Sequence, residues 1–175
     1  NLKVIHYRNG DPIPNLTKKS DWAKTRHGAT KQWAYCNYDN DENNVETYGR
    51  LYNWFSVDDE RGLAQKGWHI PTNKEWNELE DYLGDNAGGK LKSNLDWRNP
   101  NEGATNESGF TALPGGYRDN PNGIYYGMSS HGYFWSSTEY NNDTAWYRGL
   151  YYDNSEVNRT SSNKKNGLAV RLVRD

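Results

Sequence analysis

Two pairs of carboxylates in the last third of the sequence have the side chains that acid–base catalysis needs. Glu139 is followed by Asp143, and Asp153 by Glu156, each pair in a polar stretch that could form a turn. A glycoside hydrolase uses two such groups about 5 to 9.5 Å apart. Charged side chains in turns are more often simply solvated, and no Gly-x-Ser-x-Gly nucleophile motif occurs. We therefore expect a protein that is not an enzyme, with a carboxylate-pair glycoside hydrolase as an alternative.

Two other reactive side chains each have a simpler structural interpretation. His69 could act as a base or a ligand, but a histidine hydrogen-bonded at the end of a strand is more common. Cys36 is the only cysteine, so no internal disulfide can form. It lies in an aromatic stretch, and we expect it to be a small apolar core residue rather than a nucleophile.

Two loops resemble sites for metals or phosphates without completing them. The acidic stretch 39–44 repeats oxygen-bearing side chains as a calcium loop does, but Arg50 stands where an EF-hand needs its bidentate glutamate. The sequence of residues 84–90 contains part of the phosphate-loop motif, but Leu91 stands where the motif requires Ser or Thr. We expect no cofactor and no metal, with calcium at 39–44 or 138–143 as an alternative.

Aromatic side chains near amides are the best candidates for a binding site. A ring stacks on the apolar CH groups of a sugar or fills a pocket, while amides and carboxylates direct hydrogen bonds. The candidate ligand-binding residues are Tyr125, Tyr126, Tyr147, Tyr151, Tyr152 and Asn154. The same pool of aromatic residues includes Trp97, Tyr133 and Trp146.

The core must also be built largely from aromatic rings, because the chain has 8 Trp, 14 Tyr and 3 Phe but few aliphatic side chains. The tryptophans expected to be buried are Trp54, Trp68, Trp76 and Trp135. The tyrosines most expected to reach solvent are Tyr126, Tyr151 and Tyr152.

The charge balance excludes some partners. The formal net charge of the 175 residues is −2, whereas nucleic-acid binding depends on clustered Lys and Arg. No run approaches the roughly 20 apolar residues of a membrane span, and the first residues lack the apolar core of a signal peptide. We expect no nucleic-acid partner and no membrane span in this chain.

The stretch from Gly67 to Gly84, GWHIPTNKEWNELEDYLG, predicts the central helix that positions these residues. Thr72 and Glu75 form a capping box, in which each side chain accepts from the other residue's amide. Gly84 ends the helix because glycine adopts a positive φ without steric cost. The apolar stripe expected to face the core is Trp76, Leu79, Tyr82 and Leu83.

Shorter patterns predict the other elements. Before the central helix we expect a strand over 1–7, a turn at Asn9-Gly10, a short helix after Ser20 that ends before Gly28, an aromatic strand over 33–38 and a second buried helix over 48–57. After it we expect strands over 110–113, 133–138, 144–151, 157–161 and 168–173. This order indicates one α+β domain over 1–175, with an antiparallel sheet last and the termini paired in one sheet.

Several motifs together resemble a known family, the Fibrobacter succinogenes major paralogous domain. They are NLKVIHYRNGDPIP, YGRLYNWFSV, GWHIPTNKEWNELEDYLG, GGKLKS, GATNESGFTALPGGYR, FWSSTEY, AWYRGL and GLAVRLVRD. The resemblance implies a C-type lectin-like fold, related also to formylglycine-generating enzymes: two helices flanking a twisted antiparallel sheet with long loops. It also implies that a further strand motif precedes this chain, which would make it a domain trimmed from a larger surface protein.

The resemblance places the chain in secreted or cell-surface bacterial lipoproteins. We expect an extracellular or outer-membrane binding or adhesion module that recognises a glycan or protein ligand through loops and the C-terminal sheet. A variable receptor-binding protein of a diversity-generating retroelement is an alternative, because such proteins use the same fold. The Glu-Pro-Asn and Gln-Pro-Asp loops of calcium-dependent sugar lectins do not occur here.

Overall fold

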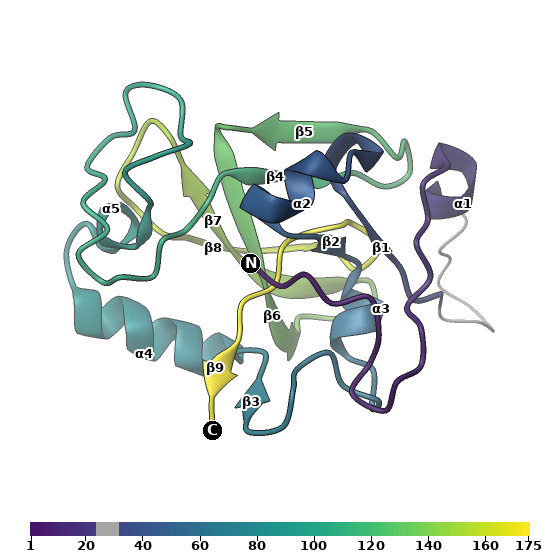
Figure 1. Ribbon diagram of the computed structural model, residues 1–175. Coiled ribbons are helices and arrows are strands. Elements are labelled where there is room, and N and C mark those ends of the chain that lie inside the picture. Colours follow the sequence, from purple (N-terminus) through teal and green to yellow (C-terminus); the bar gives the residue numbers. More distant parts are fainter. Residues whose placement is uncertain (24–31) are drawn as a thin grey trace.

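A five-stranded sheet built from the C-terminal part of the chain carries the other elements (Figure 1). The computed structural model describes residues 1–23 and 32–175. The strands lie in the order β5-β4-β6-β7-β8, with bounds β4 Gly115–Arg118, β5 Tyr125–Met128, β6 His131–Glu139, β7 Thr144–Tyr151 and β8 Asn158–Asn163. The strands predicted over 133–138, 144–151 and 157–161 are therefore confirmed.

The remaining elements are short, apart from one helix. Two-stranded ribbons join β1 (Tyr35–Cys36) to β2 (Leu51–Tyr52) and β3 (Trp68–His69) to β9 (Val173–Arg174). The helices are α1 Lys19–Ala23, a 3-10 turn Tyr38–Asn40, α2 Asn43–Tyr48, α3 Trp54–Val57, α4 Asn73–Leu83 and α5 Ala87–Leu91. No helix in the described ranges is long and apolar enough to cross a membrane. The architecture mixes α and β elements, in broad agreement with the α+β prediction.

The sheet is mixed, so the prediction of a wholly antiparallel sheet is wrong. The pairs β4–β5, β6–β7 and β7–β8 are antiparallel, but β4 and β6 are parallel neighbours through Gly116 and Gly132. The chain turns back from β4 into the edge strand β5 and then passes the end of β4 to reach its other side. This return brings β6 in beside β4 in the same direction.

The central helix forms as its sequence predicts. The Thr72 hydroxyl accepts from the Glu75 amide at 3.2 Å, and the Glu75 carboxylate accepts from the Thr72 amide at 2.8 Å. Gly84 follows the helix with φ 65°. Trp76 is 2 % exposed, but Tyr82 is 86 % exposed and therefore not part of the buried stripe. Two neighbouring apolar positions, 79 and 83, already cover that side of the helix.

A buried arginine fixes α4 to the sheet. Arg148 on β7 has no exposed surface, and its guanidinium donates to the side chains of Asn73 at 2.9 Å and Asn77 at 2.6 Å and also binds the carboxylate of Glu80. A buried charge requires this kind of complete pairing. Glu80 is thus part of the contact between helix and sheet.

Residues 48–57 do not form the predicted second helix. α2 ends at Gly49, whose φ is 74°, and Asn53 is extended and caps α3 by accepting from the Ser56 amide. Between them lies β2, buried on both faces. The apolar spacing fits a helix, but glycine and an N-cap residue divide the stretch into three elements.

Several predicted strands are irregular. In place of a strand over 1–7 there is an isolated bridge between His6 and Pro12, closed by a turn at Gly10, φ 92°. Of the strand predicted over 33–38, only the two residues of β1 are a strand. Of the strand predicted over 110–113, only an isolated bridge at Ala112 is present. Residues 168–170 pass through the core between β2 and β6 as single bridges. The terminal segments meet by a hydrogen bond from the Leu2 amide to the Val170 carbonyl, but β9 pairs with β3.

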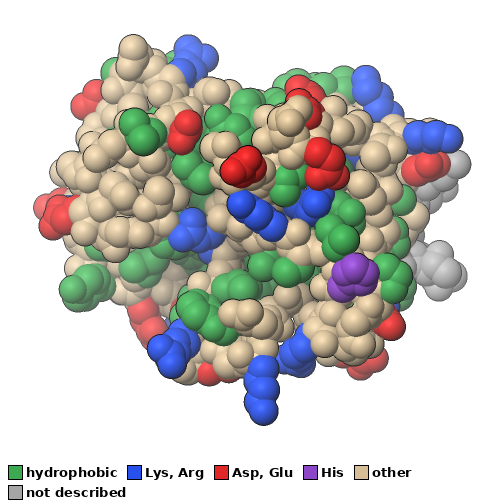
Figure 2. All heavy atoms as spheres, viewed as in Figure 1, with side chains coloured by type: hydrophobic (Ala, Val, Ile, Leu, Met, Phe, Trp, Pro, Cys, Tyr) green, Lys and Arg blue, Asp and Glu red, His purple; other side chains and the backbone are tan. Residues whose placement is uncertain are grey.

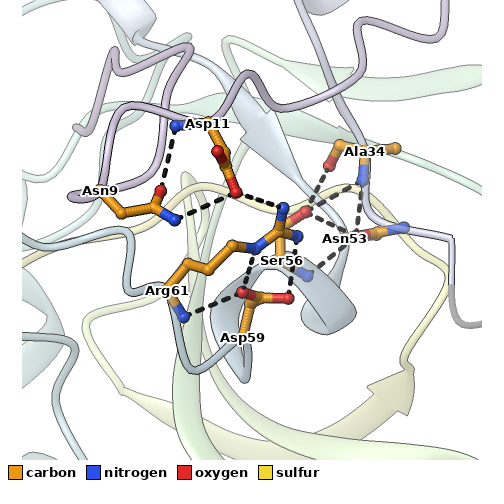
Figure 3. Close-up of polar contacts among 7 residues, drawn as sticks. All are labelled: Asn9, Asp11, Ala34, Asn53, Ser56, Asp59 and Arg61. Atoms are coloured by element: carbon orange, nitrogen blue, oxygen red, sulfur yellow. Dashed lines mark hydrogen bonds and ion pairs between the residues drawn. The ribbon is translucent and has the colours of Figure 1, made fainter.

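Arg61 joins the first hairpin to the loop that follows α3 (Figure 3). Arg61 binds both carboxylate oxygens of Asp59, at 2.7 and 3.1 Å, and reaches Asp11 at 3.3 Å. Its guanidinium also stacks on Tyr7 and Trp33, with the guanidinium carbon 4.1 and 4.5 Å from the ring centroids. The short helix after Ser20 is α1, and its predicted end before Gly28 lies outside the described residues.

The core is aromatic, as expected, with two exceptions among the tryptophans. Trp54, Trp76 and Trp135 are at most 3 % exposed, whereas Trp68 is 36 % exposed because β3 lies at the molecular edge. Trp97, considered for the surface, is buried, and its indole donates to the Ala112 carbonyl.

A buried lysine holds the long loop after α5. Lys92 has no exposed surface, and its ammonium group donates to the backbone carbonyls of Glu102, Tyr151 and Asn154 at 2.8, 2.9 and 2.8 Å. These carbonyls come from two separate segments, the loop after α5 and the turn that follows β7. The lysine therefore joins the loop to the sheet.

Candidate functional site

Alternation along β6 and β7 places several aromatic rings on one face of the sheet. His131 pairs with Tyr151, and Tyr133 lies opposite Gly149. Side chains two residues apart share a face of a strand, so these rings project together. A Cβ at residue 149 would lie 3.2 Å from the Tyr133 ring, so the glycine provides the space that this ring occupies.

Strands β4 and β5 extend this group of rings across the sheet. The centroids of Tyr117 and Tyr126 are 5.7 Å apart, those of Tyr117 and Tyr133 are 5.2 Å apart, and those of Tyr133 and Tyr147 are 5.1 Å apart. We call this set the tyrosine face; its members are Tyr117, Tyr126, His131, Tyr133, Tyr147 and Tyr151. The spacings are those of attractive aromatic pairs.

The tyrosine face is partly open to solvent and supported from below. Tyr126 is 41 % exposed, and the other members are half-buried. Tyr117, Tyr133 and Tyr147 pack against the largest hydrophobic cluster. The rings are therefore held by the core and do not need to be ordered when a ligand arrives.

The tyrosine face carries no charge of its own near neutral pH. Burial raises the pKa of Tyr117, Tyr133 and Tyr147. Burial lowers the pKa of His131, whose Nδ1 lies 2.7 Å from the Ser130 hydroxyl. The hydroxyls of these three tyrosines stay protonated and the imidazole neutral, so this part of the surface offers aromatic rings and uncharged hydrogen-bonding groups.

Comparison with known families identifies the chain. The model of the Fibrobacter succinogenes major domain matches residues 1–174, from the first hairpin to β9. The chain belongs to this family. No match is found among curated proteins or among solved structures.

In this Fibrobacter succinogenes major domain, the structure brings together half of the six candidate binding residues. Tyr126, Tyr147 and Tyr151 lie on the tyrosine face. Two residues of this face, Tyr117 and His131, were not among the aromatic candidates considered from sequence. The period-two spacing of residues 131 and 133 was the available signal for His131.

The other three candidates lie elsewhere. Tyr125 packs on Tyr38 at 5.2 Å, and its hydroxyl donates to Asn40. Tyr152 lies under the guanidinium of Arg98, 4.1 Å from its ring centroid. Asn154 accepts from the Glu156 amide within the turn after β7. Tyr125 lies on β5 but contacts the 3-10 turn Tyr38–Asn40, and Tyr152 and Asn154 lie in the turn after β7, so none of the three contacts the tyrosine face.

One residue of each carboxylate pair considered for catalysis has a side-chain partner. Glu139 binds the ammonium of Lys164, and Asp153 accepts from the Asn154 amide at 3.3 Å. Cys36 is fully buried in β1, and burial raises the pKa of its thiol to about 11. Its thiol is therefore protonated at neutral pH.

The acidic loop 39–44 comprises the end of the 3-10 turn and the start of α2. The Asp41 carboxylate accepts from the Asn43 amide at 2.9 Å, which is the hydrogen bond of an Asx turn. Among residues 1–23 and 32–175, no group of three or more His, Cys, Asp or Glu side chains is arranged to hold a metal ion. On the side shown in Figure 2, acidic and basic side chains are interspersed.

Proposed function

We propose that this domain is a non-catalytic binding or adhesion module that recognises a glycan or protein ligand through the tyrosine face. The observation that carries the proposal is the continuous set of aromatic rings across β4, β5, β6 and β7. Ring faces bind apolar CH surfaces of sugars or apolar side chains, and neutral hydroxyls accept or donate hydrogen bonds without a charged partner.

Preorganisation supports this role. A ring that is fixed before binding loses little conformational entropy when the ligand arrives. The half-buried tyrosines rest on the core, while Tyr126 on β5 offers the most exposed ring, at 41 %. A rigid surface of this kind suits recognition without chemistry.

We propose further that the fold is C-type lectin-like. The support is one main helix, α4, against a face of the C-terminal sheet, and a long irregular connection between α5 and β4. The family resemblance supports an extracellular or outer-membrane location for the domain as part of a larger surface protein. A determined structure of a family member with C-type lectin topology would test the fold.

Binding of the purified domain to an array of glycans tests the proposed function, followed by titration of any hit. Tyr126→Ala and Tyr151→Ala should each weaken binding about tenfold or more, because each removes an aromatic contact. Tyr82→Ala is the matched control, since this tyrosine is 86 % exposed on α4. A ligand whose affinity is unchanged by both face variants would show that binding occurs elsewhere.

A further inference from the structure

A recessed site lies on the opposite side of the sheet from the tyrosine face. It is a pocket of about 290 Å³ between α4 and the segment that leads into β9. Its apolar wall consists of Trp76, Leu79, Phe110, Leu172 and Val173. Trp76 and Phe110 both pack on Phe134, which faces away from Tyr133 on β6. The two sites are therefore separated by the sheet.

Arg171 at this pocket has no acidic partner among the described residues. Its guanidinium stacks on Phe110, with the guanidinium carbon 4.1 Å from the ring centroid, and donates to the Phe110 carbonyl at 2.7 Å. No ion pair joins it to a carboxylate in the part of the chain that the structure describes. A guanidinium has five N–H donors, and a carboxylate that accepts two of them in parallel is the partner that fits its geometry best.

The indole N–H of Trp76 is a second group without a partner among the described residues. Trp76 is 2 % exposed, and its Nε1 is buried without an acceptor among the described residues. An indole N–H can only donate, and a buried donor without an acceptor calls for an explanation. An acceptor supplied by a ligand in the adjoining pocket would provide one.

The acidic groups at the pocket are already matched. Glu75 binds His69 at 2.6 Å through one oxygen and the Thr72 amide at 2.8 Å through the other. Glu78 lies 3.5 Å from the ammonium of Lys74. Each carboxylate that lines the pocket thus has a basic neighbour, whereas Arg171 has no carboxylate partner among the described residues.

We propose that this pocket binds a small organic carboxylate with one aromatic or branched apolar group. The apolar group fits the wall formed by Leu79 and Val173, and the carboxylate supplies the acidic partner that Arg171 lacks. The pocket volume of about 290 Å³ is close to the lower end of the range for small-molecule sites, so the proposed ligand is a small free molecule.

Titration with 3-phenylpropionate, followed by the indole N–H resonances in nitrogen-15 NMR spectra, tests this proposal. Trp76→Phe identifies the Trp76 resonance by its disappearance. In the unchanged protein we expect 3-phenylpropionate to shift that resonance and to bind about tenfold more tightly than 3-phenylpropanol, which lacks the charge. Arg171→Gln should remove this preference, and Arg174→Gln, on an exposed residue of β9, should keep it.

The outcomes separate the alternatives. Equal affinity for the acid and the alcohol in the unchanged protein, or no shift of the Trp76 resonance, would overturn the proposal without any variant. A peptide ending in phenylalanine that binds more tightly than 3-phenylpropionate would overturn the assignment to a free small molecule. Because the tyrosine face lies on the other side of the sheet, the two binding proposals can be tested separately, and failure of one does not decide the other.

Discussion

Lys92 shows how one side chain can organise two loops. A buried ammonium group is costly unless its hydrogen-bonding capacity is filled. Lys92 has three protons to donate and three backbone carbonyls within 2.9 Å. One of those carbonyls belongs to Tyr151, so the lysine also fixes the end of β7 where the tyrosine face ends.

Lys92→Met should therefore destabilise the domain by about 3 kcal/mol, because it leaves buried carbonyls without a donor. Urea unfolding of the variant and the parent measures the difference. Lys66→Met, the same change at an exposed lysine, should have little effect. Equal stability of Lys92→Met and the parent would mean that water replaces the ammonium at no cost.

His69 links the capping box to the C-terminal segment. Its Nε2 lies 2.6 Å from Glu75 and its Nδ1 lies 2.7 Å from Asp175. The hydrogen bond to Asp175, and then that to Glu75, raises the pKa of His69 above 6.5. Protonation is thus favoured in the folded state, and the stabilisation is complete below about pH 6.5 and is lost as pH rises through the folded-state pKa.

His69→Gln should lower the melting temperature more at about pH 5.5 than at about pH 9, because only the protonated ring contributes this stabilisation. Thermal melts of both proteins across that range measure the gap. His6→Gln, at an exposed histidine, provides the control. A gap that does not change with pH would show that the ring acts only through packing.

At the scale of elements, α4 depends on the cap at its first turn. Thr72→Ala removes the hydroxyl that accepts from the Glu75 amide and should cost about 1 kcal/mol. Chemical denaturation measures this cost, with Thr160→Ala on the exposed part of β8 as the control. If Thr72→Ala left stability unchanged, the contacts of α4 with Arg148, and not its cap, would determine where the helix begins.

Elements with local signals could be predicted from the sequence, and elements set by distant contacts could not. The capping box at Thr72 and the glycine at residue 84 define α4 within its own residues. β7 matches its prediction because alternation and flanking turns are local signals. The segment 168–173 was predicted as one strand, but only its first two residues bridge β2 and β6, because the tertiary fold determines its neighbours.

The candidate site was predictable only in part for the same reason. Tyr126, Tyr147 and Tyr151 were candidates as individual aromatic residues, but the parallel pairing of β4 with β6 brings Tyr117 to Tyr133. Parallel neighbours are joined by long connections that sequence patterns do not reveal. Trp68, expected in the core, is 36 % exposed because its strand lies at the edge.

For the whole molecule, β6 connects the two largest hydrophobic clusters. Trp135 belongs to one and Phe134 to the other, on opposite faces of the same strand, and both are at most 1 % exposed. Neither cluster can lose its packing without exposing the strand that supports the other.

We therefore expect urea unfolding to be a single cooperative transition. Tryptophan fluorescence and far-ultraviolet circular dichroism should give the same midpoint, as two-state unfolding requires. Midpoints that differ between the two probes would show that one side of β6 unfolds before the other and that the domain has two separable parts.

Lys92, which joins the loop after α5 to the turn after β7, also affects how this domain responds to its surroundings. Loops are often held by a dissociable calcium ion that carbonyl oxygens coordinate, and such loops loosen when a chelator removes the ion. At this junction the positive charge is covalently attached to the chain at Lys92. No chelator can extract it, so this contact between the two loops does not depend on a dissociable metal ion.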